Sequence, residues 1–284
     1  MKLPPFDYAC PATVTEAVAL LASREDAKAI AGGQSLVPML AFRLAAPSLL
    51  VDLRKLSELR AITMSPHGIT LGAMVRWCDI LDDARLRTAQ PLLVAAIEHV
   101  AHYQIRNRGT VGGSIAHADP AAEMPGIAVT CDAEIAVVGR YGARTIAAAD
   151  FFLGTLTTAL APDEIITEIR LPPWPPQRRW GFQEFARRRG DFALAAAALW
   201  YDQDGDGRIR NAHVGAIGVG DRPLRLPEVE AVLNGRRVDA STIARVEQAA
   251  AAAVHPADDI HASGAYRRAL VGTLVERALT SAAA

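Results

Sequence analysis

Apolar positions in the first part of the chain follow first a helical and then a strand-like spacing. Thr13 with Glu16 forms a capping-box pattern, in which the Glu16 carboxylate can reach back to the Thr13 amide. The apolar residues that follow recur at helical spacing. Two short apolar runs, 27–31 and 49–53, are typical of buried strands, and the first is ended abruptly by Gly32-Gly33. The pattern predicts a small α/β unit.

The pattern predicts a second unit beyond residue 56. Pro91 stands at the start of a predicted helix, where proline is favoured. Apolar runs on either side of Gly139-Arg140-Tyr141-Gly142 indicate a β-hairpin. An unusual polar and glycine-rich run, 104–123, lies between them. The predicted elements are strands at 69–74 and 164–171, a helix at 91–102 and hairpin strands at 134–138 and 143–146.

A proline cluster, Pro172-Pro173-Trp174-Pro175-Pro176, marks a domain boundary, because it cannot continue a helix or a central strand. Three predicted strands follow it and precede three predicted helices, which is typical of an α+β domain. The strands are expected at 181–186, 192–201 and 208–219, and the helices at 227–233, 241–254 and 263–279. We therefore divide the chain into three parts: 1–55, 56–174 and 177–284.

Composition indicates a core-forming globular protein, because 51% of the 284 residues are hydrophobic and 21% are charged. The 30 Lys and Arg nearly cancel the 31 Asp and Glu, so we expect no general attraction to nucleic acid or to an anionic membrane. No run reaches the roughly 18 apolar residues of a membrane-spanning helix. The N-terminus is a poor signal peptide, and we expect a cytoplasmic protein. Cys10, Cys78 and Cys131 show no C-x-x-C spacing, which argues against a metal site in this chain.

Two glycine-containing segments are candidate phosphate sites: AGGQSLVP at 31–38 and TVGGSIAHADP at 110–120. A Gly-Gly step lets the backbone approach a ligand closely and adopt positive φ. Successive N–H groups then face a concavity that suits a phosphate oxygen, and Ser35 and Ser114 add hydroxyl donors. Either segment alone is also compatible with a tight turn that binds nothing. Neither is a P-loop, and the chain has no G-x-G-x-x-G fingerprint.

Together the two segments resemble a known family. AGGQSLVP and IRNRGTVGGSIAHADPAAEMP, about 80 residues apart, are similar to the flavoprotein (medium) subunit of molybdenum hydroxylases. That family includes aerobic carbon monoxide dehydrogenase and the flavin part of xanthine dehydrogenase. ARRRGDFA at 186–193 and YRRAL at 266–270 resemble the start and the last helix of the family's C-terminal domain. The resemblance covers essentially the full length of the chain.

The resemblance implies an α+β fold, in which a two-subdomain FAD-binding domain of the vanillyl-alcohol-oxidase type precedes a C-terminal antiparallel sheet with helices. It also implies an oxidoreductase subunit that binds FAD non-covalently and relays electrons to an external acceptor. A small partner subunit with two-iron iron–sulfur clusters would supply the electrons. A large partner subunit with a molybdenum–pterin centre would hydroxylate the substrate. The implied assembly is a dimer of heterotrimers.

By the same resemblance, the backbone around 32–36 and 111–115 would hold the FAD pyrophosphate. Asp119 would lie near the cofactor, with Asp191 and Phe192 on the isoalloxazine side. Ser114 stands where many relatives carry Asn, and a serine donates a hydrogen bond over a shorter reach. No residue is assigned as a general base. The residues predicted to bind FAD are Ala31, Gly32, Gly33, Gln34, Ser35, Leu36, Thr110, Val111, Gly112, Gly113, Ser114, Ile115, His117, Asp119, Asp191 and Phe192.

Two other patterns favour ordinary structural roles. DQDGDG at 202–207 copies the first half of an EF-hand loop, but His213 stands at the twelfth position, where a bidentate Glu is needed. A solvated β-turn is therefore the preferred interpretation. His99 and His102 would share one helical face but have no third ligand in the sequence, which favours surface or satisfied histidines over a metal site.

Other residues leave alternatives open. His117 either contacts the flavin or satisfies a loop carbonyl, and Arg187-Arg188-Arg189 is either a solvated strand end or a group that stabilises reduced flavin or faces an electron acceptor. A self-contained FAD-dependent oxidoreductase acting on a small molecule is an alternative function, with His213, Tyr201 and Asp191 available for proton transfer. A scaffold subunit without flavin is a third, although both glycine segments look intact.

Overall fold

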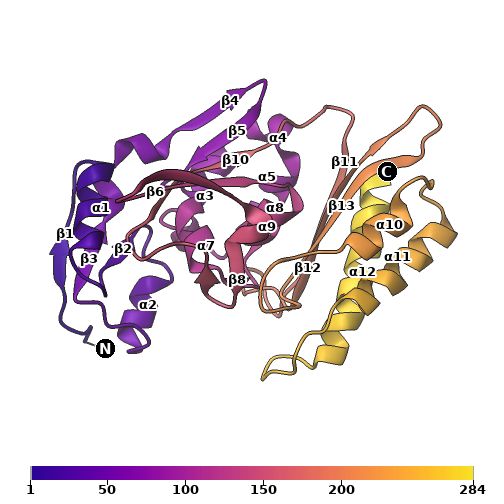
Figure 1. Cartoon of the computed structure of the whole chain (residues 1–284). Helices are drawn as coiled ribbons and strands as arrows, with labels where there is room; N and C mark the ends of the chain where they lie inside the picture. Colours follow the sequence, from indigo (N-terminus) through magenta and orange to yellow (C-terminus); the bar gives the residue numbers. More distant parts are fainter. Residues whose placement is uncertain (1, 284) are drawn as a thin grey trace.

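The computed structural model describes residues 2–283 and arranges the chain in three units that follow one another along the sequence (Figure 1). The strands form a three-stranded sheet in the order β1-β3-β2, a five-stranded sheet β4-β5-β10-β6-β7, a four-stranded sheet β11-β12-β13-β14 and the pair β8-β9. The strands are β1 Asp7–Ala9, β2 Lys28–Ile30, β3 Leu49–Asp52, β4 Ile62–Ser65, β5 Gly68–Gly72, β6 Glu134–Gly139, β7 Gly142–Ala147, β8 Phe152–Gly154, β9 Thr157–Thr158, β10 Ile165–Leu171, β11 Arg179–Phe185, β12 Ala195–Gln203, β13 Ile209–Ile217 and β14 Leu224–Arg225.

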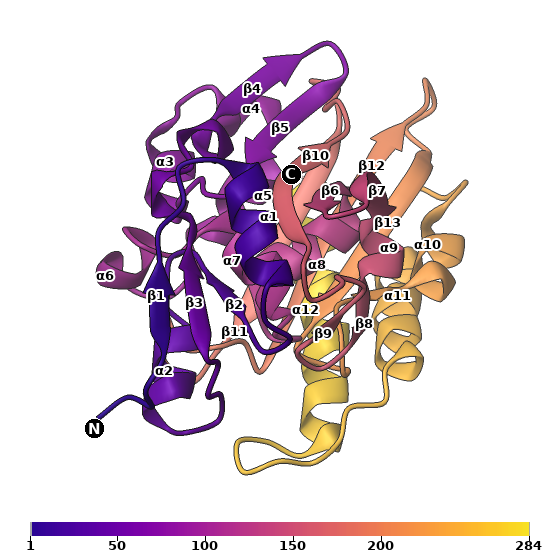
Figure 2. The same cartoon turned by 60° about the vertical axis from the view of Figure 1, so that its left-hand side comes forward.

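Helices cover each sheet. They are α1 Val14–Ala22, α2 Leu36–Ala41, α3 Trp77–Asp82, α4 Leu86–Ala89, α5 Pro91–Ile97, α6 Tyr103–Arg106, α7 Val111–His117, α8 Glu123–Thr130, α9 Ala148–Phe151, α10 Pro227–Leu233, α11 Ala240–Ala253 and α12 Gly264–Ala283. Two short 3-10 helices, η1 Leu53–Lys55 and η2 Ser57–Arg60, connect the first sheet to the second. Figure 2 brings the first unit forward and shows its strands beside the helices of the second.

The first unit is a parallel sheet with α1 packed on it. Thr13 begins α1 as predicted, and its Oγ1 accepts a hydrogen bond of 3.2 Å from the Glu16 amide. The Glu16 carboxylate bonds the amide of Ala12 and not that of Thr13, so the predicted capping box is shifted by one residue. The strands predicted at 27–31 and 49–53 are confirmed as β2 and β3. Strand β1 was not predicted.

The second unit is an antiparallel sheet covered by short helices. The hairpin is confirmed, with Gly139 opposite Gly142 at its turn. The helix predicted at 91–102 is wrong beyond Ile97, because α5 ends there and Ala101 takes a positive φ of 38°. The run 104–123, for which no element was predicted, contains the whole of α7 and most of α6.

The third unit is an antiparallel sheet that is buried on both faces. Helices α10, α11 and α12 cover the outer face, as Figure 1 shows, while α5 and α8 of the second unit lie against the inner one. Strand β12 therefore reads as a continuous apolar run, Ala195 to Leu199, without alternation. The strand predicted at 192–201 is wrong at its start, since Phe192 lies in the preceding loop and β12 begins only at Ala195.

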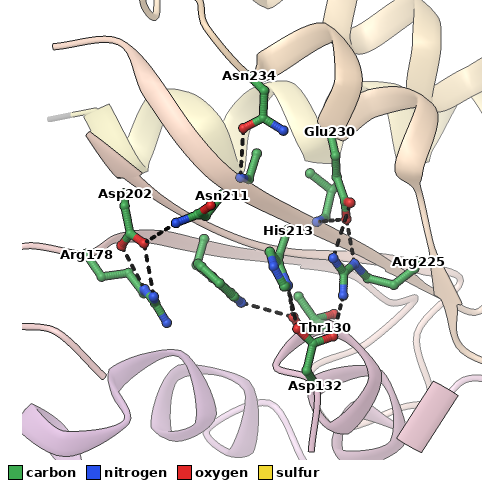
Figure 3. A network of polar contacts seen from close by, with 12 residues as sticks. Thr130, Asp132, Arg178, Asp202, Asn211, His213, Arg225, Glu230 and Asn234 are labelled. Atoms are coloured by element: carbon green, nitrogen blue, oxygen red, sulfur yellow. Dashed lines mark hydrogen bonds and ion pairs between the residues drawn. The ribbon is translucent and has the colours of Figure 1, made fainter. Parts of the chain in front are cut away.

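A polar network joins the second and third units at the carboxyl end of α8 (Figure 3). The carbonyl oxygen of Thr130 accepts a hydrogen bond of 3.0 Å from Trp200 Nε1, and His213 Nδ1 lies 3.2 Å from the same oxygen. The His213 ring stacks on Trp200 with ring centres 3.7 Å apart, and the Arg178 guanidinium lies 3.7 Å from the centre of the same indole. Asp132 pairs with Arg225 at 2.6 Å. The third unit is thus held by directional contacts as well as by apolar packing.

Candidate functional site

A cavity of about 540 Å³ lies where the first unit meets the second. Its volume is within the range of sites for small organic ligands. The predicted residues that line it are Ala31, Gly32, Gly33, Gln34 and Thr110. The other lining residues are Ile30, Val37, Pro38, Arg54, Arg60, Met74, Arg76 and Arg108. The two glycine segments therefore meet at one cavity.

The first glycine segment forms a loop between β2 and α2 with free N–H groups. Gly33 adopts a φ of 71°, a conformation that residues other than glycine rarely take. The side-chain amide of Gln34 donates to the Gly32 carbonyl oxygen at 2.8 Å. The loop then runs into the first turn of α2, whose N–H groups have no partner within the helix. Within residues 2–283, no acceptor bonds the backbone N–H groups of Gly33, Gln34, Ser35 and Leu36.

The second glycine segment differs from the expectation, because it is helical and its N–H groups are occupied. Thr110 begins α7, and its side chain accepts from the Gly113 amide at 3.2 Å. The amides of Val111 and Gly112 donate to the carbonyls of Val75 and Ala73, and the Ser114 amide donates to Thr110. In this conformation the segment offers no second concavity of free amides. Its role in binding a cofactor stays a prediction.

The glycines of both segments permit close approach. A Cβ on Gly32 would lie 2.2 Å from the Arg108 carbonyl oxygen, and one on Gly112 would lie 2.5 Å from the Ala73 Cβ. Gly112 thus lets α7 sit on the residues after β5, while Gly32 lets the first loop touch the backbone just ahead of Thr110. The first segment therefore contacts the backbone of Arg108 and Gly109, directly ahead of the second segment.

The arginines of the cavity were not predicted as site residues. Asp52, which is almost fully buried, holds Arg54, and its pKa lies below the usual value because hydrogen bonds from Arg54 and Tyr8 outweigh the effect of burial. Asp79 binds Arg76 through both carboxylate oxygens at 2.7 and 3.0 Å. Arg108 is part of the IRNRGT sequence and could have been singled out there. Nothing in the local pattern marks Arg54 or Arg60.

The remaining predicted residues lie outside the cavity lining. Ser35 and Leu36 start α2, whereas Val111, Gly112 and Ile115 are buried in α7. His117 ends α7, and burial lowers its pKa while Asp119 opposes the shift. Its side chain makes no hydrogen bond within the described residues, so the loop-carbonyl interpretation has no support here.

Asp191 and Phe192 lie in the loop that leads into β12. Gly190 takes a φ of 88°, and a Cβ there would lie 2.5 Å from the His102 ring, so the loop packs against the segment before α6. Phe192 is 62% exposed, and Arg187 lies 3.9 Å from Asp191. Behind the loop, the buried Arg267 guanidinium donates to the Leu194 carbonyl at 2.6 Å and to the Gly218 carbonyl at 3.1 Å.

A pair of buried carboxyl groups was also missed. Glu123, at the start of α8, is 7% exposed, and burial with the nearby Glu184 raises the pKa of its carboxyl to about 8. The Glu184 side chain is 3% exposed, and one of its oxygens has no partner within the described residues. A single sequence cannot reveal this pair, because the two residues come from different units.

Two patterns with metal-like spacing have structural roles. Both His99 and His102 lie beyond the end of α5, so they share no helical face, and His99 contacts Phe182 edge-on at 5.1 Å. The turn after β12 is the predicted β-turn, in which Asp204 accepts from the amides of Asp206 and Arg208. Within residues 2–283 no group of three or more His, Cys, Asp or Glu side chains is arranged to hold a metal ion.

The three residues considered for proton transfer do not converge. Tyr201 points into the core under the C-terminal helices, with its hydroxyl unbonded within the described residues. His213 packs against Thr130 at the opposite face of the sheet, and Asp191 lies in the loop before β12. No acid–base relay forms among them.

Two family models divide the chain between them. The model described as the FAD binding domain in molybdopterin dehydrogenase matches residues 4–174, and the carbon monoxide dehydrogenase flavoprotein C-terminal domain matches residues 180–282. The chain belongs to this family of FAD-binding medium subunits. It is 40% identical over 284 residues to the nicotine 6-hydroxylase medium subunit of Paenarthrobacter nicotinovorans, covering 100% of this chain and 99% of that one.

Solved structures agree with the medium-subunit assignment. Carbon monoxide dehydrogenase from Hydrogenophaga pseudoflava matches with a TM-score of 0.96 and 36% identity over 99% of this chain and 98% of that one. Quinoline 2-oxidoreductase from Pseudomonas putida 86 matches with a TM-score of 0.95 and 40% identity, covering 100% and 98% of the two chains. The medium subunit therefore has the predicted α+β fold, with an FAD-binding domain and a C-terminal antiparallel sheet, and is an oxidoreductase subunit. None of its helices within residues 2–283 has the length and apolar character needed to span a bilayer.

Proposed function

We propose that this medium subunit binds FAD non-covalently at the junction of its first two units and relays electrons from iron–sulfur clusters of a partner subunit to an external acceptor. The observation that carries the proposal is the cavity lined both by arginine side chains and by Gly33 and Gln34, whose backbone amides are free. Free N–H groups and guanidinium groups are the donors that a pyrophosphate requires. The residues present therefore fit the cofactor.

The chain's own groups bind and position FAD in this proposal. The loop 31–36 and the segment 110–115 flank the pyrophosphate, with His117 at the end of α7 and Asp119 just beyond it. Asp191 and Phe192 lie on the isoalloxazine side, where the exposed Phe192 ring offers an aromatic surface. Once bound, FAD supplies the capacity to accept electrons singly and release them in pairs. No side chain is required as a nucleophile or general base.

We further propose that the subunit assembles with a small iron–sulfur subunit and a large molybdenum–pterin subunit as a dimer of heterotrimers in the cytoplasm. The relatives above are named for nicotine, carbon monoxide and quinoline, although their medium subunits are similar to this one over nearly the whole chain. This similarity supports our proposal that the large partner subunit chooses the substrate.

The test is an absorption spectrum of the purified chain, repeated on the supernatant after denaturation and centrifugation. Flavin bands that move to the supernatant and match FAD support the proposal. Flavin that stays with the denatured protein would indicate covalent attachment. A colourless chain that takes up no added FAD would overturn the proposal. Turnover of a small molecule without partner subunits would instead support a self-contained oxidoreductase.

A further inference from the structure

The cavity carries more positive charge than its own carboxylates compensate. Its lining holds Arg54, Arg60, Arg76 and Arg108, and no acidic side chain of the described residues is part of that lining. Like charges gathered around one space repel one another, and a group of opposite charge that enters the space relieves that repulsion. The number of arginines without a paired carboxylate therefore indicates how much negative charge a ligand of this cavity should carry.

Two of the four arginines are each paired with a carboxylate that is not part of the cavity lining. Arg54 pairs with the buried Asp52 at 2.5 Å, and Arg76 pairs with Asp79 at 2.7 Å. Each carboxylate also accepts a backbone amide, from Arg54 and Arg76 respectively, which fixes the pair to the chain. Because each guanidinium group is offset by its carboxylate, these two arginines contribute little net charge to the cavity.

The other two arginines keep their charge. Arg60 donates to the carbonyl oxygen of Arg54 at 2.9 Å, which orients its side chain without neutralising it. The Arg108 side chain has no hydrogen bond or ion pair with any other described residue, and its backbone touches Gly32. Two uncompensated positive charges thus stand at the loop whose amides lack acceptors.

We propose that Arg60 and Arg108 bind the pyrophosphate of FAD together with the free backbone amides of Gly33 and Gln34, which line the same cavity. A pyrophosphate diester carries two negative charges, which match the two uncompensated guanidinium groups. The amides of the second glycine segment cannot donate to the pyrophosphate, because they bond Ala73, Val75 and Thr110. Arg108 supplies a donor in their place. The inference rests on the proposed function, because it assigns residues to the cofactor proposed there.

The experiment measures FAD affinity of the full chain, stripped of flavin, at low and high salt. Arg60→Gln and Arg108→Gln are each expected to weaken binding about 10-fold to 100-fold, the usual effect of losing a charged hydrogen bond. Both variants should also show a smaller salt dependence than the unaltered chain, because one charge interaction is gone. Arg108→Lys keeps the charge and should recover part of the affinity. Arg245→Gln, at an exposed position on α11, is the matched control.

The outcomes separate the two proposals. If the unaltered chain binds no FAD, the proposed function fails. If it binds FAD and both Gln variants bind it with unaltered affinity and salt dependence, only the arginine assignment is wrong. Equal losses in Arg108→Gln and Arg108→Lys would also overturn that assignment, since they would indicate shape and not charge. Thermal unfolding of each variant shows whether the fold is retained before affinity is compared.

Discussion

His213 Nδ1 lies 3.2 Å from an Asp132 carboxylate oxygen, across the junction between the FAD-binding part and the C-terminal part of the chain. Asp132 follows the end of α8, where the carbonyl groups of the last turn favour positive charge. Burial of the ring and the nearby Arg225 nevertheless lower the pKa of His213, although Asp132 and Glu230 oppose them. The folded protein therefore favours the neutral imidazole.

Acidification should weaken this junction. Because the folded pKa of His213 lies below its unfolded value of 6.5, its contribution to stability is present above about pH 6.5 and is lost as the pH falls from that value to the lower folded pKa. His213→Gln should therefore lose less unfolding free energy than the unaltered chain between pH 7.5 and pH 5.5, as measured by urea unfolding. His255→Gln, at an exposed position, is the control. An identical loss in His213→Gln would show that the ring is not protonated on unfolding.

Glu123 should give the opposite pH dependence. Its folded pKa of about 8 lies above the unfolded value of 4.5, so the folded state retains a proton that the unfolded state has released, and stability falls as the pH rises between these values. Glu123→Gln should be more stable than the unaltered chain at pH 8.5, by on the order of 4–5 kcal/mol, and nearly equal to it at pH 4.5. Unfolding free energies across this range check the prediction, with Glu25→Gln as an exposed control. A constant difference at all pH values would contradict it.

Gly32→Ala should separate the two glycine segments. The new Cβ would lie 2.2 Å from the Arg108 carbonyl oxygen. Because this oxygen belongs to the backbone and cannot rotate away as a side chain can, the loop must move. We expect a loss of roughly 1–3 kcal/mol in unfolding free energy and a lower flavin content of the purified chain. Gly205→Ala is the matched control, since a Cβ there meets nothing within 4 Å. Equal flavin content in the two variants would show that this contact does not shape the site.

Arg267→Met should loosen the loop that carries Asp191 and Phe192. Its guanidinium is the donor for the buried Leu194 and Gly218 carbonyls, and leaving them unbonded should cost about 2–4 kcal/mol. Limited trypsin digestion reports the effect, because Arg187, Arg188 and Arg189 lie in this loop and should be cleaved faster. Arg268→Met, at the exposed neighbouring position, should leave the digestion rate unchanged. Unaltered cleavage in Arg267→Met would mean that the loop is held by other contacts.

Elements with a strong local signal could be predicted from the sequence. Thr13 marks the start of α1, and the Gly139 to Gly142 turn determines the hairpin, because capping and turn preferences act over a few residues. The C-terminal helices follow from their apolar periodicity. Strand β1 is exposed and short, and it exists only because it pairs with β3 more than 40 residues away. No pattern within Asp7–Ala9 reveals that partner.

The site was harder to predict than the fold. Both glycine segments were identified, but the helix over Val111–His117 was missed because two glycines lower helix propensity. The Thr110 cap and the bonds to Ala73 and Val75 compensate for that loss. Arg60 reaches the cavity from a 3-10 helix that has no distinctive sequence, so its position depends on long-range packing. Charge pairing in the cavity can be read only from the structure.

The bond between Arg267 and Leu194 has a consequence for the order of events during synthesis. The two residues are 73 positions apart, and the loop 31–36 precedes both by more than a hundred. The loop proposed to bind the pyrophosphate leaves the ribosome early, whereas the support for Phe192 is complete only after Arg267 has emerged. A nascent chain can therefore form the first part of the site but not its far wall. We therefore expect stable loading of the flavin only after Arg267, in the first turn of the last helix, has emerged.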